Sequence, residues 1–176
     1  MKIIRRIILV CVFIPFIVCG QNKNRPFLPK YDVLLKKSLE KSGVRKDSIR
    51  YVLNSVPKEQ LEAVSFLIAY MPERDLKTLS VKFIKDQVEG AYKAKKEFPW
   101  CAKLPDSIFF NEVLPYYCFD EVRDNWRNDF YTKFSPIVKE CKDMRQAIQL
   151  VNKNIRDILQ VDYNTKRSIV NISPFQ

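Results

Sequence analysis

The chain has 176 residues, of which 47% are hydrophobic and 29% are charged, and its formal net charge at pH 7 is +11. This composition is typical of one globular domain and excludes an intrinsically disordered chain. The sequence contains no histidine and only three glycines. It therefore excludes a Ser-His or Cys-His nucleophile pair, an HExxH zinc site and a glycine-rich phosphate loop.

The first twenty residues are typical of a secretory signal peptide. Three basic residues precede an apolar run at 7–18, which contains Pro15 and is followed by Cys19 and Gly20. A membrane-spanning helix needs about 20 apolar residues, so this run is too short to be one. We expect residues 1–20 to be a signal peptide and the protein to be exported to the periplasm or the cell surface.

Two kinds of processing fit this segment. Cleavage after Gly20 would leave a soluble protein, whereas lipid attachment at Cys19 would leave a lipoprotein anchored to a membrane. Loss of residues 1–20 lowers the net charge from +11 to +8, because three positive charges and no negative ones are removed. The remaining lysines alternate with acids, which is typical of solvated helix surfaces. We expect no nucleic-acid partner, and membrane contact only through a lipid on Cys19.

Three cysteines lie beyond the signal segment, at Cys101, Cys118 and Cys141. Their spacing matches no CxxC or zinc-ribbon pattern, so we predict no metal site and no cofactor. One disulfide plus a free thiol is one expectation in an oxidising compartment, and buried free thiols are the other. A catalytic thiol needs a partner base, which the histidine-free sequence does not supply, so we predict no catalytic residue.

Apolar residues recur at helical spacing along most of the chain, after a tether at 21–30 that we expect to be extended because it contains Pro26 and Pro29. Ser55 is predicted to cap the third helix, and Asp75 or Thr78 to begin a longer helix that ends at Lys93–Glu97. The expected helices cover residues 31–42, 48–54, 55–71, 75–97, 106–112 and 144–158, together with one in the stretch described next.

The most distinctive stretch, residues 100–134, reads WCAKLPDSIFFNEVLPYYCFDEVRDNWRNDFYTKF. It contains an LPY turn and then apolar residues that recur every four positions, which predicts one helix that ends near Ser135. The apolar residues of that helix are Val122, Trp126, Phe130 and Phe134. Trp126 is expected to anchor it in the core, and Glu121 and Arg127 to fix it to the LPY turn.

The predicted fold is mainly α, a multi-helix orthogonal bundle of about six or seven helices with a short strand-like C-terminal tail. The strand-like segments are residues 161–163 and 168–172, where branched residues alternate with polar ones. Glycine or serine linkers, charge runs and internal repeats are absent from the mature sequence, so residues 31–176 are expected to form one helical domain.

Three segments together resemble the N-terminal half of a family of exported bacterial transglutaminase-like proteins. They are AYMPERDLKTLS, AYKAKKEFPWCAKLPDSIFFNEVLPYYCFDEVRDNWRNDFY and NKNIRDILQVDYNTKRSIVNISPF, within residues 60–176. The residues that carry the match most specifically are Leu114, Pro115, Tyr116, Glu121, Trp126 and Arg127. Tyr117 and Cys118 depart from the family pattern, in which a small residue or Arg commonly follows LPY.

The resemblance implies a papain-like core whose Cys, His and Asp act on amide or peptide bonds and lie beyond an SPF-like sequence, here residues 173–175. No catalytic residue of the family has a counterpart in this sequence. We therefore expect a non-catalytic helical region that supports this core in cis, with residues 142–176 as the start of the core. The alternative is a complete helical module that binds an envelope glycan or peptide through the aromatic face near Tyr116 and Trp126.

Overall fold

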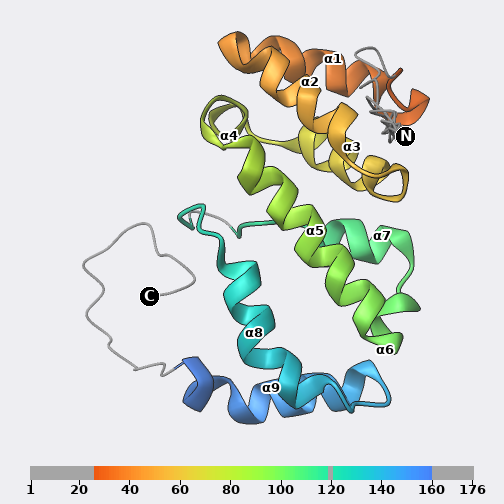
Figure 1. Cartoon of the computed structure of the whole chain (residues 1–176), viewed down its shortest axis with the longest axis vertical. Helices are drawn as coiled ribbons and strands as arrows, with labels where there is room; N and C mark the ends of the chain where they lie inside the picture. The colour runs from red at the N-terminus through yellow and green to blue at the C-terminus, as the bar shows by residue number, and fades with distance from the viewer. Residues whose placement is uncertain (1–25, 119–120, 160–176) are drawn as a thin grey trace, which may run out of the picture.

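The computed structural model describes residues 26–118 and 121–159 (Figure 1). In these ranges the chain forms α-helices and no strand, so the mainly α prediction is confirmed. The helices are α1 (Asp32–Lys41), α2 (Lys46–Ser55), α3 (Leu61–Tyr70), α4 (Glu73–Thr78), α5 (Val81–Glu97), α6 (Pro99–Ala102), α7 (Asp106–Ile108), α8 (Trp126–Val138) and α9 (Met144–Leu159). The signal segment, Cys19 and the strand-like tail lie outside the described residues.

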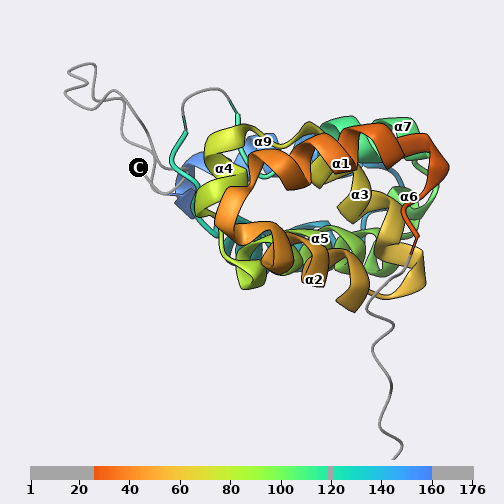
Figure 2. The same cartoon turned by 90° about the horizontal axis from the view of Figure 1, so that it is seen from above.

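Helix α5 runs diagonally through the molecule and joins two groups of helices (Figure 1). At one end, α1 packs against α3 and α4, and α2 packs against α3 and α5. At the other end, α6 follows α5, while α8 lies beside α5 and packs against α9. From above, α1 and α4 lie on one side of the molecule and α2 and α5 on the other (Figure 2). Helix α5 contacts both groups, because α2 and α3 pack against it at one end and α6 and α8 at the other.

The main core is built on one face of α5. Ile84, Val88 and Ala91 recur at helical spacing and are at most 1% exposed. They pack in one cluster with apolar residues of α1 to α4 and with Phe109 and Leu114. A second, smaller cluster joins the end of α5 to α6, α8 and α9 through Phe98, Cys101, Val138, Cys141 and Ala147. The two clusters explain why the helices at both ends of α5 stay attached to it.

Two helix starts differ from the prediction. Ser80 caps α5, because its Oγ accepts a hydrogen bond from the backbone N–H of Phe83 at 3.0 Å, so α4 and α5 are separate helices. Ser55 ends α2 instead of capping α3: its hydroxyl donates to the carbonyl oxygen of Val52 at 3.3 Å. Helix α3 begins after a 3-10 turn at Lys58–Gln60. Serine therefore lies at the start of α5 and at the last residue of α2, whereas Ser55 was predicted to cap the start of the following helix.

The helix predicted to include Val122 begins only at Trp126. Val122 lies in the non-helical segment before α8 and is 42% exposed, so the prediction that it shares a buried helix face with Trp126 is wrong. The helix also passes the predicted end near Ser135 and continues to Val138 with Pro136 inside it. The N–H of Lys139 donates to the carbonyl oxygen of Ser135 at 3.0 Å, which carries the helical bonding past the proline.

The tether expected at residues 21–30 overlaps the described structure from Pro26. Phe27 and Leu28 pack against the main core, and Pro29–Tyr31 form a 3-10 turn. The Lys30 ammonium lies 3.0 Å from the Glu62 carboxylate. The folded part of the chain therefore begins before Tyr31.

Helix α9 keeps part of its apolar stripe in contact with solvent. Ala147 is 3% exposed and packs in the second cluster, whereas Ile148 is 52% and Ile155 is 38% exposed. The core face predicted for this helix is therefore only partly covered by the described residues. None of the helices in the described ranges is both long and apolar enough to span a membrane.

All three cysteines in the described residues are free thiols, and Cys118 is exposed while Cys101 and Cys141 are buried. Burial raises the pKa of the Cys101 thiol, which lowers its thiolate fraction. In the chain from Gln21 onward, we expect iodoacetamide at pH 7.5 to alkylate only Cys118 in the native state, and all three thiols in guanidinium chloride. Intact mass reports the number of labels.

The control for this prediction is Cys118→Ser, which should remove the native label and leave the two that need unfolding. Native alkylation of Cys101 at the rate of Cys118 would contradict the burial described above. A disulfide in the unreacted protein, detected as missing thiols after unfolding, would contradict the free state of all three.

Candidate functional site

The six residues that carry the family resemblance lie together where the start of α8 meets α5. Leu114 and Tyr116 are buried, at 0% and 3% exposed, and Trp126 and Arg127 form the first turn of α8. Pro115 lies between the two buried residues. The structure thus brings the LPY turn and the WR pair into direct contact, and the contacts are made mainly through backbone carbonyl groups.

Arg127 connects three parts of the chain. Its Nε donates to Gln87 Oε1 on α5 at 3.1 Å, and its Nη2 donates to the carbonyl oxygens of Pro115 at 2.9 Å and Leu114 at 3.2 Å. Burial lowers the pKa of the Arg127 guanidinium to about 10, which leaves it protonated at neutral pH. We call Arg127, Gln87 and the two carbonyl groups the arginine clasp.

Gln87 is fully buried and extends the clasp to the residue before α8. Its Nε2 donates to Asn125 Oδ1 at 2.9 Å, while its Oε1 accepts from Arg127. Asn125 in turn donates from Nδ2 to Asp86 Oδ2 at 3.1 Å. Because a buried amide is stable only when its donors and acceptors are satisfied, Gln87 ties the start of α8 to α5 at one position.

Trp126 adds a second connection to the LPY turn. Its indole Nε1 donates to the carbonyl oxygen of Tyr116 at 3.0 Å, and its ring centroid lies 5.3 Å from that of Phe130. The side chain is partly buried and lines a surface groove with Phe130. Trp126 therefore packs at the edge of the core and not in its centre.

Glu121 closes a short turn before α8. Its Oε2 accepts from the backbone N–H of Cys118 at 2.8 Å, and its own N–H donates to the carbonyl oxygen of Cys118 at 3.1 Å. Arg123 donates through Nη1 to the carbonyl oxygen of Glu121. These contacts of Glu121 lie within the segment that leads to α8.

Asp75 is a central residue of this region, although its local sequence pattern predicts only a helix start. It is 1% exposed, and its Oδ2 accepts from the Tyr116 hydroxyl at 2.9 Å and from Arg123 Nε at 3.0 Å. Arg74 Nε lies 3.2 Å from Oδ1. The Tyr116 and Arg123 partners are 41 and 48 positions away in sequence, so no local pattern could reveal this pairing.

The Tyr116 hydroxyl serves as a donor in this network. Burial raises its pKa above the usual value, and the nearby Asp75 carboxylate raises it further. The phenol therefore stays protonated at neutral pH and is not a nucleophile or a base. Asp75 is already paired with a guanidinium, which leaves the network suited to holding structure and not to moving a proton.

Gly90 allows α8 to approach α5 closely. A Cβ atom at this position would lie 2.8 Å from Arg127 Cδ and 3.2 Å from Cγ. The Arg127 side chain cannot swing aside freely, because its guanidinium makes three hydrogen bonds. A residue without a side chain is therefore required where the clasp crosses α5.

Two surface grooves flank Tyr117. The first, which we call the aromatic groove, has a volume of about 380 Å³ and is lined by Phe66, Tyr70, Met71 and Tyr117, among others. The second, about 410 Å³, is lined in part by Trp126 and Phe130. Tyr70 is 61% exposed, whereas Tyr116, on which the binding-module hypothesis relied, is buried at 3%. Tyr116 lines the aromatic groove with little exposed surface, so a ligand of this face would mainly meet Tyr70 and Tyr117.

The described residues hold no group of three or more His, Cys, Asp or Glu side chains that could bind a metal ion. At the α5–α8 junction, Arg127 bonds to Gln87 and to backbone carbonyl groups, and Asp86 pairs with Lys82 and Asn125. Chemically, this arrangement can fix the angle between two helices and present the grooves beside them.

The Asp75 network should dominate the stability of the α4–turn region. Asp75→Asn leaves the largely buried Arg123 without a counter-charge, so we expect a loss of about 3–5 kcal/mol in the free energy of unfolding. Tyr116→Phe removes one hydrogen bond to a charged acceptor and should cost about 1.5–3 kcal/mol. Urea unfolding measures both values.

The matched control is Arg74→Ala, because Arg74 is 65% exposed and its ion pair with Asp75 is screened by water. We expect that change to cost less than about 1 kcal/mol. Equal losses for Arg74→Ala and Tyr116→Phe would show that the buried hydroxyl is not a significant partner of Asp75.

Gly90 and Arg127 should be coupled energetically. Alanine is a better helix former than glycine by about 1 kcal/mol, yet we expect Gly90→Ala to destabilise the protein by about 1–3 kcal/mol, because its Cβ collides with Arg127. In an Arg127→Ala background, the same change should instead stabilise by about 1 kcal/mol. A double-mutant cycle in urea measures this reversal.

An exposed α5 position supplies the control for that cycle: Lys96→Ala should change the free energy of unfolding by less than about 0.5 kcal/mol in either background. The collision with Arg127 is disproved if Gly90→Ala stabilises the protein that retains Arg127.

Comparison with models of known protein families, with curated protein sequences and with solved structures finds no match for this chain. The resemblance of the LPY and WR residues to transglutaminase-like proteins therefore stays a prediction, and the geometry of the α5–α8 junction is the basis for a functional proposal.

Proposed function

We propose that this chain is a non-catalytic helical region of an exported transglutaminase-like protein, and that it supports a Cys-His-Asp core outside these 176 residues. The observation that carries the proposal is the use of the motif residues. Arg127 and Trp126 donate hydrogen bonds to the carbonyl groups of residues 114–116, and the Tyr116 hydroxyl donates to Asp75. Residues used in this way shape a scaffold and do not react with a substrate.

The partly exposed apolar stripe of α9 is a second observation in favour of a core that packs on this chain in cis. Ile148 and Ile155 lie seven positions apart on one face of the helix, and both expose more than a third of their surface. An apolar stripe on an amphipathic helix is commonly buried by another element. Helix α9 ends directly before residues 160–176, which carry the YNTKR and SPF parts of the family resemblance.

A second candidate is a complete module that binds an envelope peptide or glycan. The aromatic groove favours it, because Tyr70 is 61% exposed beside Phe66 and Tyr117. Tyrosine rings supply a large contact area that loses little conformational freedom on binding. In this candidate the chain would act without a catalytic core, and the groove beside Tyr117 would be the contact surface.

The test begins with the source genome downstream of codon 176. We expect a reading frame that continues with a Cys, a His and an Asp, and whose full-length product incorporates a fluorescent amine into a glutamine-containing protein or cleaves a peptide bond. In that product, Ile155→Lys should lower activity by disturbing the α9 contact, while Asn152→Lys, on an exposed part of the same helix, should leave activity unchanged.

A downstream sequence without Cys and His in any frame would overturn the proposal. The binding-module candidate would then be tested with solubilised peptidoglycan fragments, whose binding should be lost in Tyr70→Ala at unchanged stability. Full activity of Ile155→Lys in a full-length product would instead show that the core packs elsewhere than on α9.

A further inference from the structure

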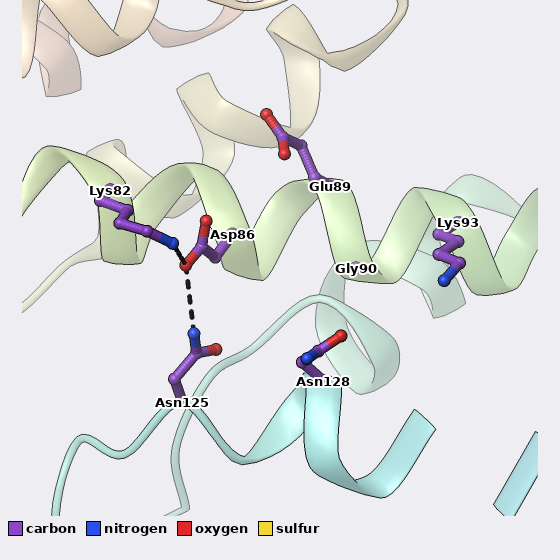
Figure 3. Close-up of a pocket in the computed structure, with 7 residues that line it drawn as sticks. All are labelled: Lys82, Asp86, Glu89, Gly90, Lys93, Asn125 and Asn128. Carbon is purple, nitrogen blue, oxygen red and sulfur yellow. Dashed lines mark hydrogen bonds and ion pairs between the residues drawn. The ribbon is translucent and has the colours of Figure 1, made fainter. Parts of the chain in front are cut away.

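A polar pocket lies between α5 and the start of α8 (Figure 3). Its volume is about 350 Å³. Lys82, Asp86 and Lys93 of α5 line it, together with the backbone of Gly90 and the side chains of Asn125 and Asn128. Every lining side chain is polar, which distinguishes this pocket from the two grooves beside Tyr117.

One wall of the pocket is fixed before any ligand binds. The Asp86 carboxylate lies 2.6 Å from the Lys82 ammonium and accepts from Asn125 Nδ2 at 3.1 Å, as the dashed lines in Figure 3 show. Asn125 is held in turn by the buried Gln87. Groups that are already ordered lose little conformational entropy on binding, so this wall is preorganised.

Another part of the pocket wall, towards Lys93, presents unused hydrogen-bonding groups. In Figure 3 the Asn128 amide lies across the gap from Gly90, in the space between Asp86 and Lys93. Within residues 26–118 and 121–159 this amide has no hydrogen-bond partner. The Lys93 ammonium rests 4.0 Å from the centroid of the Tyr131 ring, which leaves its N–H groups available to a ligand. The wall thus offers both donors and an acceptor.

Gly90 lines the pocket where α5 and α8 approach each other closely. A Cβ atom at that position would meet Arg127 Cδ at 2.8 Å and Cγ at 3.2 Å. The absence of a Cβ therefore allows the close approach of Arg127 to the α5 backbone beside the pocket.

The charges of the lining residues select the class of ligand. Lys82 and Lys93 balance Asp86 and Glu89, so the pocket has no net charge. A phosphate or sulfate would face the Asp86 carboxylate, and a metal cation would face two ammonium groups. An apolar molecule would leave the amides without partners, at a cost in free energy. A neutral polyhydroxyl compound, whose hydroxyl groups both donate and accept, meets all of these groups.

The size of the pocket limits the neutral polyhydroxyl ligand to a single sugar ring. Ligand pockets typically enclose about 300–1,000 Å³, and this one is near the lower limit. We propose that the pocket binds one neutral sugar residue, either free or as part of a glycan. Asn128 and Lys93 donate to its hydroxyl groups, and Asp86 accepts from one of them. The proposal rests on residues outside the LPY turn and holds whether or not a catalytic core follows the chain.

Two-dimensional ¹H–¹⁵N NMR of the chain from Gln21 onward tests this directly. Titration with D-glucose and with N-acetyl-D-glucosamine should produce saturable shifts at the amides of Gly90 and Asn128 with at least one of the two sugars. Parallel titrations with glycine and with sodium sulfate test whether the pocket binds a zwitterion or an anion instead. Neither compound should produce saturable shifts at the amides of Gly90 and Asn128.

Asn128→Ala should weaken sugar affinity about tenfold, which corresponds to the loss of one or two hydrogen bonds. Because Asn128 is exposed, the thermal unfolding midpoint of the Asn128→Ala variant should equal that of the unmodified protein. Asn152→Ala, at an exposed position of α9, is the matched control and should keep the affinity of the unmodified protein. Absence of saturable shifts with both sugars, equal affinity in Asn128→Ala, or preferential binding of glycine or sulfate would each overturn the proposal.

Discussion

The arrangement of this protein depends on a guanidinium group that bonds to neutral oxygens instead of a carboxylate. Arg127 donates to one buried amide and to two backbone carbonyl groups. Each of these acceptors is fixed, since Gln87 belongs to α5 and the carbonyls belong to a turn whose Leu114 is fully buried. The planar fork of arginine has directional donors, so the clasp sets the angle of α8 as well as its distance from α5.

The clasp and the Asp75 network share the LPY turn. Tyr116 donates its hydroxyl to Asp75, while its backbone carbonyl accepts from the Trp126 indole. One residue therefore connects the network that holds α4 with the first turn of α8. Buried polar groups of this kind contribute little net stability when satisfied but cost several kcal/mol when one partner is lost. Their main effect is to specify one arrangement of helices that apolar packing alone would leave less defined.

The sequence predicted the helices well and their polar connections poorly, for a physical reason. Periodicity reports which face of a segment is apolar, so α3 and α9 were predictable from their own residues. It cannot report a partner more than 40 positions away, and the Asp75 pairs are of that kind. The same limit explains the error at Val122. The spacing there suits a helix, but Glu121 bonds to the Cys118 N–H and Arg123 reaches Asp75, and these contacts hold the segment out of helical geometry.

The clasp also determines what the surface offers. Because Gln87 positions Asn125 and Arg127 passes close to Gly90, the polar pocket is bounded by groups that are fixed by the same interaction that orients α8. Helix α8 in turn packs against α9, whose apolar stripe is partly uncovered. A ligand in the pocket would contact the start of α8, and a domain on α9 would contact the helix that packs against α8. The geometry of the pocket therefore depends on Arg127, because Gln87 bonds both to Arg127 and to Asn125.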